Sequence, residues 1–361
     1  MAVEKISIET FIELRKKYPV LDVRSPGEFG HAHIPSAHSL PLFTDEERKI
    51  VGTAYKQESR ERAVKIGLQY FGTRMVQIVE TAERLTGLTK KDIEDGNKKT
   101  VLVHCWRGGM RSAGIAWLLD LYGFKVLTLS GGYKVFRKWV LQQFEKSYSL
   151  KVIGGYTGSG KTALLQYLKA RGEAIIDLEG LARHKGSAFG NLEDSKQPSQ
   201  ELFENQLAVA LYEASCKQQT IWIEDESQRI GYVNIPTKLY RSKQLMPVYF
   251  IEVPFEDRLK FIITHYGQFE KERLINAILR INKRLGSLET KTAVNYLAED
   301  NIEKCFAILL IYYDKCYEKS LFELYENTKR KMKKIQCTDV NAEVNAQRIL
   351  KLFENIQNHE C

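Results

Sequence analysis

The chain has 361 residues, of which 43% are hydrophobic and 27% charged, with a formal net charge of +9. This length and composition predict a globular protein of about two domains. Each domain would be large enough to form a hydrophobic core that needs no stabilising disulfide or metal ion. The first residues lack a basic segment followed by an apolar run, and the longest apolar run, residues 306–313, is too short to cross a bilayer. We therefore expect a cytoplasmic protein with no membrane partner.

The first 146 residues alternate between strand-like and helix-like segments. Apolar runs at residues 18–23, 100–104 and 125–129 predict strands, and the apolar spacing over 112–122 predicts a helix. This alternation is typical of an α/β domain with a mostly parallel sheet. A polar stretch at 145–149 marks the boundary, which divides the chain into predicted domains of residues 1–146 and 147–361.

The second domain begins with a predicted strand at residues 151–154, a Gly-rich turn and a helix at 162–169. Further strands are predicted at 174–177, 220–223 and 247–253. Beyond about residue 255 the apolar spacing is helical, and the tail after about residue 300 also reads as helices. The fold class is therefore an α/β domain with a helical C-terminal part.

A candidate reactive cysteine, Cys105, follows the strand predicted at 100–104 and precedes a Gly-Gly turn and a helix. In such a turn backbone N–H groups converge into an anion-binding nest, and nearby arginines stabilise a thiolate. The other five cysteines lack these surroundings, and none of the six forms a C-x-x-C pair, so the cysteines predict neither a zinc site nor a redox-active dithiol. The candidate catalytic residues are Cys105, Arg107, Gly108, Gly109 and Arg111.

Residues 155–162, Gly-Tyr-Thr-Gly-Ser-Gly-Lys-Thr, match the phosphate-binding P-loop pattern between a predicted strand and helix. Its amides would hold a diphosphate, while the Thr162 hydroxyl can take Mg²⁺. Glu224 or Asp225, after the strand at 220–223, could hold a metal or orient Lys161, and no tightly bound cofactor is predicted. The candidate phosphate-binding residues are Gly155, Thr157, Gly158, Ser159, Gly160, Lys161 and Thr162.

Two basic stretches, residues 280–284 and 329–334, lie in the second domain. Clusters of this kind can bind a polyanion such as RNA, or they can form a solvated helix surface. Charge alone leaves both interpretations open.

The first 145 residues resemble the rhodanese family. Residues 22–29 (Asp-Val-Arg-Ser-Pro-Gly-Glu-Phe), 33–37, 40–42 and 129–133 (Leu-Ser-Gly-Gly-Tyr) look like its signatures. In that family the cysteine accepts a chalcogen atom as a persulfide and passes it on. Cys105 to Arg111 is a C-x5-R loop, one residue longer than the usual sulfurtransferase loop and similar to that of rhodanese-like phosphatases.

The whole chain resembles the tRNA 2-selenouridine synthase family. The resemblance extends over residues 45–48, 51–57, 177–184, 186–190, 203–205, 224–227, 230–231 and 283–286. It implies a P-loop NTPase-like second domain and a two-step change at the tRNA wobble position. 2-Thiouridine is geranylated with geranyl diphosphate, and selenium from selenophosphate then replaces the geranylthio group.

The same resemblance implies a role for Cys105 and a set of partners. Cys105 would carry selenium as a perselenide, and the P-loop would hold the prenyl diphosphate. The partners would be tRNA carrying 2-thiouridine and an enzyme that supplies selenophosphate. Lys283 and Arg284, with residues 329–334, are the candidate tRNA contacts.

Three other interpretations remain. His104-Cys105-x5-Arg111 also has the form of a phosphatase or arsenate reductase, which leaves the P-loop unexplained. An ATP-dependent tRNA sulfurtransferase would carry the pattern S-G-G-x-D-S, and Ser130-Gly131-Gly132-Tyr133-Lys134 lacks the Asp-Ser. A nucleotide-gated RNA-binding protein with an inactive rhodanese domain would have no reason to keep Cys105.

Overall fold

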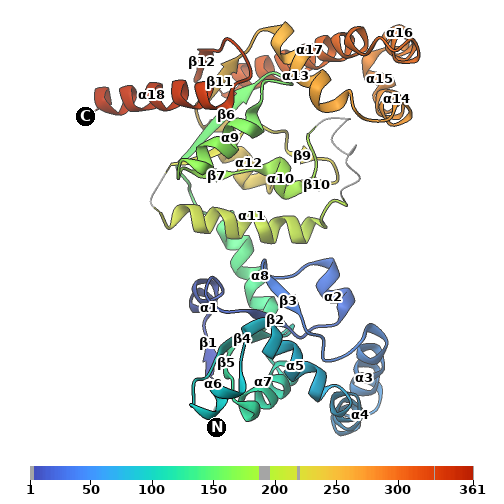
Figure 1. The fold of residues 1–361 in the computed structure, drawn as a ribbon, viewed down its shortest axis with the longest axis vertical. Helices are drawn as coiled ribbons and strands as arrows, with labels where there is room; N and C mark the ends of the chain where they lie inside the picture. Colours follow the sequence, from blue (N-terminus) through green and yellow to red (C-terminus); the bar gives the residue numbers. More distant parts are fainter. Residues whose placement is uncertain (1–3, 187–195, 218–219, 329, 361) are drawn as a thin grey trace. The chain divides into compact units, whose positions relative to one another are not determined.

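The computed structural model describes residues 4–186, 196–217, 220–328 and 330–360. Contacts within the chain divide it into two compact units (Figure 1). The first holds residues 1–143 with 204–206, and the second holds residues 144–203 with 207–361. Residues 187–190 of the family-specific stretch at 186–190 lie outside the described residues.

The first unit is built on a five-stranded sheet in the order β1-β5-β4-β2-β3, and all its neighbouring strands are parallel. This confirms the predicted parallel α/β domain. The predicted strands at 100–104 and 125–129 are present with those bounds, and the one predicted at 18–23 is present as residues 20–22. Strands β1 and β3 were not predicted, because most of their residues are not buried and no apolar run marks them. The strands are β1 (Glu4–Ile6), β2 (Val20–Asp22), β3 (Ala37–Ser39), β4 (Thr100–His104) and β5 (Lys125–Leu129).

Eight helices connect or follow these strands in the described part of the first unit. Local capping starts several of them; in α3, for example, the Thr44 hydroxyl accepts from the Glu47 amide while Glu47 accepts from the Thr44 amide. The helices are α1 (Ile8–Leu14), α2 (Pro26–His31), α3 (Asp45–Gln57), α4 (Arg60–Gly72), α5 (Met75–Thr86), α6 (Lys90–Glu94), α7 (Met110–Tyr122) and α8 (Gly132–Gln143).

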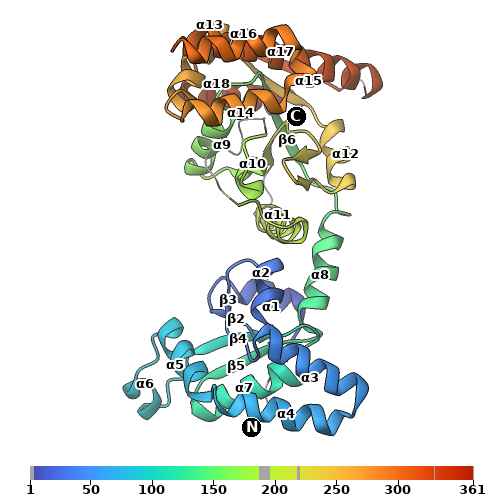
Figure 2. The ribbon, with the colours of Figure 1, turned by 90° about the vertical axis from the view of Figure 1, so that its right-hand side faces the viewer.

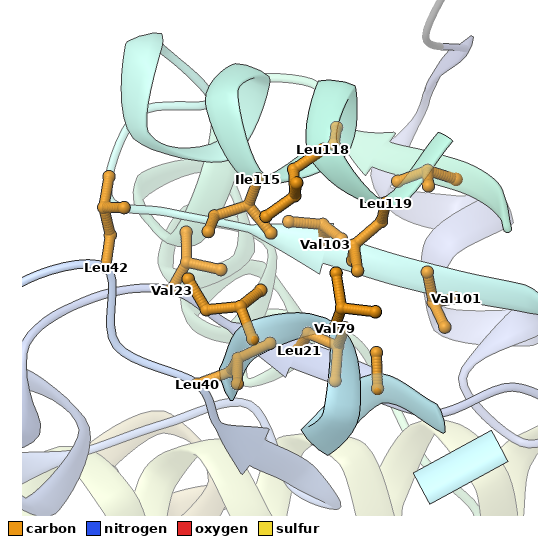
Figure 3. Packing of buried hydrophobic residues seen from close by; sticks show 14 of the residues in the cluster. Leu21, Val23, Leu40, Leu42, Val79, Val101, Val103, Ile115, Leu118 and Leu119 are labelled. Carbon is orange, nitrogen blue, oxygen red and sulfur yellow. The ribbon is translucent and has the colours of Figure 1, made fainter. Parts of the chain in front are cut away.

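Alternation along β4 directs its side chains to the two faces of the sheet. Figure 3 shows Val101 and Val103 among the side chains of α7, in a buried cluster that also includes β2 and α5. His104 points to the opposite face, where its ring meets Phe11 of α1 and Tyr133 of α8. Both faces of β4 are therefore packed, and Cys105 follows directly at the end of the strand.

The second unit contains another five-stranded parallel sheet, in the order β12-β11-β6-β8-β7. The strand that leads into the P-loop, β6, is central, so the loop leaves the carboxyl edge of the sheet, where α/β proteins bind ligands. The strands are β6 (Leu150–Gly155), β7 (Ala174–Ile176), β8 (Ile221–Glu224), β11 (Val248–Glu252) and β12 (Met332–Gln336), with a small antiparallel pair β9 (Arg229–Ile230) and β10 (Val233–Asn234).

Helices cover this sheet and extend beyond it. One buried cluster joins α9 and α18 to Trp222 and Tyr249 of the sheet. A second cluster joins α13, α14, α16 and α17, which form a bundle with α15 in Figure 2. The helices are α9 (Lys161–Ala170), α10 (Leu178–Ala182), α11 (Gln200–Ser215), α12 (Thr237–Leu245), α13 (Phe255–Tyr266), α14 (Lys271–Arg280), α15 (Asn282–Leu285), α16 (Ser287–Ala298), α17 (Ile302–Thr328) and α18 (Ala342–Glu360).

The predicted helical tail is wrong at one place. Residues 332–336 form β12, which pairs in parallel with β11 from Val248 to Glu252. Four of its residues are Met, Lys, Lys and Gln, so no apolar run marks it. Pairing with a strand some 80 residues earlier decides its conformation. In the part of the chain that the structure describes, no helix has the length and apolar character that crossing a membrane requires.

Candidate active sites

The first site is the loop between β4 and α7, with Cys105 at its start. Cys105 is only 3% exposed, and its Sγ lies 3.3 Å from the hydroxyl of Ser112 in the first turn of α7. That hydroxyl also lies 3.0 Å from the Gly109 carbonyl oxygen, so it can donate to either. Ser112 directly follows the predicted residue Arg111, and its contact with the thiol was not predicted.

A second turn, at residues 130–132, holds the cysteine loop in place. The amides of Tyr133 and Lys134 donate to the carbonyls of Cys105 and Trp106 at 2.9 and 3.0 Å. Gly108 has φ +64°, and a β-carbon there would lie 2.8 Å from the Leu129 carbonyl oxygen. Glycine is needed at 108 both for its backbone angle and for this close approach.

Hydrogen bonds and charge favour the thiolate of Cys105. Burial raises its pKa, but hydrogen bonds from the Ser112 hydroxyl and from the amides of Ser112 and Arg107, with the charge of Arg111, outweigh burial, so the pKa is lowered. Arg111 is held by Glu28, whose carboxylate lies 2.9 Å from its Nη1. Arg107 is exposed. The loop therefore combines a thiol of lowered pKa, amide donors and a positioned guanidinium.

Residues of the rhodanese-like signature around Asp22 pack beside the cysteine loop. Asp22 and Arg24 form a buried ion pair at 2.6 Å, and Arg24 also donates to the Ala32 carbonyl and stacks on Tyr133 at 3.8 Å. His104, which is fully buried, has its pKa lowered by burial despite Asp22, so we treat it as neutral. These residues have a structural role, since removing one partner of a buried ion pair leaves the other uncompensated.

The second site is the P-loop between β6 and α9, which begins at Lys161. Gly158 and Gly160 adopt φ of +80° and +75°, which lets the loop turn back over the end of β6. The Lys161 ammonium donates to the Gly155 carbonyl at 2.9 Å, and the buried Ser159 hydroxyl donates to Tyr156. The structure thus brings together all seven predicted residues of this loop.

Two acidic side chains other than the predicted ones, Glu179 and Glu226, interact with the charge of Lys161. Asp225 instead pairs with Lys243 and Arg330, and Glu224 accepts from the amide of Glu179. No hydrogen bond between Lys161 and Glu224 or Asp225 is found among the described residues, where Lys161 donates to the Gly155 and Tyr156 carbonyls. That Glu224 or Asp225 holds a metal or orients Lys161 stays a prediction.

Glu179 joins this acid cluster to the P-loop. Its carboxylate accepts from the Thr162 hydroxyl at 3.1 Å. Burial and repulsion from Glu226 raise the pKa of Glu179 to about 7, against the opposing effect of Lys161. Burial likewise raises the pKa of Glu226, although Lys161 opposes this. Among the described residues, no group of three or more His, Cys, Asp or Glu side chains is arranged to hold a metal ion.

Glu179→Gln is expected to stabilise the ligand-free, metal-free protein at high pH only. The pKa of Glu179 in the folded protein is about 7, above its ordinary value of 4.5, so folding favours the protonated carboxyl. The stability that the protonated carboxyl contributes is fully present below pH 4.5 and is lost as the pH rises through about 7, where the buried carboxylate becomes charged. At pH 8 the variant should gain about 1–3 kcal/mol in the free energy of unfolding. Thermal unfolding at pH 4.5 and 8 measures this, with exposed Glu256→Gln as control. An equal gain at both pH values would contradict it.

A cavity of about 800 Å³ opens over the P-loop. One side is lined by the P-loop, Glu179 and Glu226, and another by aromatic and apolar side chains of α13 and α17. Arg183, Lys185 and Arg284 also line it. The volume exceeds what a diphosphate alone would fill and lies within the range of small-molecule sites.

A second cavity, of about 680 Å³, has a basic lining. Arg229, Arg280, Lys283 and Arg284 line it, with no acidic side chain among its lining residues. In the described ranges, Arg280, Lys283 and Arg284 form no ion pair with a carboxylate. Arg284 lines both cavities, so the predicted residues Lys283 and Arg284 lie beside the P-loop cavity.

The other predicted basic stretch is largely engaged within the fold. Arg330 is 4% exposed and pairs with Asp225, and Lys334 pairs with Glu252. Lys329 lies outside the described residues. The prediction that this stretch contacts tRNA is wrong for Arg330, because its guanidinium is buried. Lys331 is exposed, and for this residue the contact stays a prediction.

Comparisons with known proteins match both units. A family model described as "tRNA 2-selenouridine synthase AAA domain" matches residues 148–348, and one described as "Rhodanese-like domain" matches residues 7–138. A tRNA 2-selenouridine synthase of Psychromonas ingrahamii is 31% identical over 84% of this chain and 88% of its own length. A protein with the same name from Shewanella denitrificans is 40% identical over 69% of this chain and 65% of its own length. Another, from Hydrogenovibrio crunogenus, is 36% identical over 75% of this chain and 77% of its own length.

Proposed function

Because this chain belongs to the tRNA 2-selenouridine synthase family, we propose that it converts 2-thiouridine at the wobble position of tRNA into 2-selenouridine. The conversion has two steps, geranylation of sulfur at the P-loop site and exchange for selenium at the Cys105 site. The observation that carries the proposal is the presence in one chain of a P-loop, with Lys161 folded back on it, and a Cys105 thiol whose pKa is lowered. A phosphatase or arsenate reductase would leave the P-loop domain without a role.

In the first step, the P-loop holds the diphosphate of geranyl diphosphate. The thiocarbonyl sulfur of the base attacks C1 of the geranyl chain, an S–C bond forms, and the C1–O bond breaks. Pyrophosphate leaves with that electron pair, and the base loses its N3 proton to water or a nearby carboxylate. Lys161 and the loop amides stabilise the negative charge that develops on the leaving group.

Mg²⁺ fits this site as a partner of the diphosphate. The Thr162 hydroxyl and the Glu179 carboxylate, 3.1 Å apart, are hard oxygen ligands, and diphosphate oxygens and water would complete the coordination. When bound, the ion neutralises charge on the diphosphate. It would also relieve the repulsion between Glu179 and Glu226, and this supports its placement there.

In the second step, Cys105 acts on selenophosphate. Its thiolate attacks phosphorus, the S–P bond forms, and the P–Se bond breaks, so that selenium leaves with the electron pair as hydrogen selenide. The loop amides and Arg111 bind the phosphoryl oxygens. Selenide attacks C2 of the geranylated base and geranylthiol leaves, while water cleaves the S–P bond and releases phosphate.

This route keeps selenium at one oxidation level. A perselenide on Cys105, which the family resemblance implied, would need a two-electron oxidant in addition to selenophosphate. The C-x5-R loop with Ser112 beside the sulfur supports a phosphoryl acceptor, because the hydroxyl can stabilise the thiolate when it leaves phosphorus. The partner enzyme in this proposal is one that supplies selenophosphate.

The tRNA is proposed to bind along the basic second cavity, with the wobble nucleotide reaching the P-loop cavity past Arg284. Phosphates of the RNA backbone would meet Arg280, Lys283 and Arg284. Because these cations have no carboxylate partner among the described residues, they are available for phosphate.

The double variant Arg280→Ala/Lys283→Ala should bind tRNA less tightly than the wild-type protein, and its affinity should fall less steeply as the salt concentration rises. Each lost phosphate contact is expected to lower the slope of log affinity against log salt by about 0.7–0.9. Filter binding between 50 and 200 mM KCl, about the range over which such slopes are resolved, measures it. Lys334→Ala is the matched control, since Lys334 is already paired with Glu252. An unchanged slope in the double variant would rule out this cavity as the RNA site.

Mass analysis of wobble nucleosides tests the proposed function. Thiolated tRNA is incubated with the protein, geranyl diphosphate and selenophosphate, each omitted in turn. Without selenophosphate the geranylated nucleoside should accumulate, and without geranyl diphosphate 2-thiouridine should remain. If 2-thiouridine is unchanged with both donors present, the function is a different one.

A further inference from the structure

We propose that the α13–α17 wall of the P-loop cavity binds the isoprenoid chain and selects its length. This wall consists of Phe261, Ile262, Tyr266, Tyr312, Tyr313 and Tyr317, and His265 and Cys316 of the same helices also line the cavity. The inference rests on the proposed prenyl transfer and adds the residues that recognise the hydrocarbon part of the donor.

The wall begins directly at the P-loop. A β-carbon at Gly158 would lie 2.8 Å from Cδ1 of Ile262, so this aliphatic side chain packs against the loop that holds the diphosphate. The first atoms of a ligand beyond its phosphates would therefore meet hydrocarbon on this side. A ribose requires hydrogen-bonding partners at that point, whereas an allylic chain requires none.

The wall continues through aromatic side chains from both helices. Phe261 of α13 and Tyr312 and Tyr313 of α17 line the cavity and are half-buried. Tyr312 and Tyr313 pack against the helical bundle, and their rings have centroids 5.2 Å apart. Ring faces bury apolar chains and also attract the positive charge that develops on an allylic carbon as pyrophosphate leaves. One surface can therefore supply binding energy and stabilise the transition state.

The wall is attached to the P-loop by a buried arginine. Arg258 of α13, 4% exposed, donates to the Thr157 carbonyl at 3.1 Å and forms a two-point ion pair with Asp314 of α17 at 2.9 and 2.7 Å. The Tyr317 hydroxyl lies 3.5 Å from the Gly155 amide. Because both helices are bonded to the loop, the distance from the diphosphate to the wall is set, and chain length can be discriminated.

Calorimetric titration of the wild-type protein with geranyl diphosphate, inorganic pyrophosphate and ATP, each with Mg²⁺, tests the proposal. Geranyl diphosphate should bind at least about 10-fold more tightly than pyrophosphate, given the free energy of burying its hydrocarbon. Phe261→Ala and Tyr312→Ala should each weaken geranyl diphosphate about 10-fold and leave pyrophosphate within about 2-fold. Tyr296→Ala is the matched control, because Tyr296 packs in the same bundle but does not line the cavity.

A wild-type protein that binds geranyl diphosphate no more tightly than pyrophosphate would overturn the proposal, and so would tighter binding of ATP. This comparison needs no variant, so misfolding of Phe261→Ala cannot hide the result. The dimethylallyl and farnesyl diphosphates should both bind less well than the geranyl compound; equal affinity for all three would refute length selection. If geranyl diphosphate binds through the wall but no prenyl transfer follows, the proposed reaction fails and the binding site stands.

Discussion

Cys105→Ala is expected to abolish 2-selenouridine formation, by about 1,000-fold or more, while geranylated tRNA still forms and accumulates. The loss follows because alanine cannot attack selenophosphate, whereas the P-loop site contains no atom of Cys105. Nucleoside mass analysis measures both products in one sample. Cys216→Ala, at an exposed cysteine outside the loop, controls for loss of a thiol elsewhere.

Retention of labelled phosphate on the protein tests the role of Cys105 as phosphoryl acceptor. Protein quenched in acid after brief exposure to ³²P-labelled selenophosphate should retain the label, and the Cys105→Ala protein should retain none. If selenium rather than phosphorus remains on the protein, Cys105 is a selenium carrier. If Cys105→Ala makes 2-selenouridine at the wild-type rate, the cysteine loop has no part in the reaction.

Lys161→Ala should reduce geranylation about 100-fold to 1,000-fold, because the ammonium group stabilises the charge of departing pyrophosphate. Selenium exchange on tRNA that was geranylated beforehand should be nearly unaffected. Single-turnover assays with the two RNA substrates separate these steps. Lys169→Ala, an exposed lysine on the same helix, is the control. Normal geranylation by Lys161→Ala would exclude the P-loop as the diphosphate site.

Both candidate loops could be predicted from the sequence because each is a local motif. Gly158 and Gly160 provide positive φ angles, Lys161 follows them directly, and neighbouring residues cannot be far apart in space. The same holds for Cys105, Gly108 and Arg111. Strand bounds at 100–104 and 125–129 were predicted for the same reason, since apolar runs between turns mark strands that are buried on both faces.

Contacts between distant residues could not be predicted in this way. Glu224 and Asp225 are plausible partners for Lys161 by position, yet Asp225 is bonded to Arg330, 105 residues later. Glu179 reaches Thr162 only because β7 and β6 lie in one sheet. Strand β12 has no apolar run and forms because β11 offers it an open edge.

The sequence by itself therefore determined the fold class, the cysteine loop and the P-loop, since their chemistry and geometry lie within a few consecutive residues. Only the tertiary structure decided which acids interact with the charge of Lys161, that Arg330 is buried, and that α13 and α17 form an apolar wall beside Gly158. These features arise from packing between segments that are separate in the chain, and no spacing within one segment encodes them.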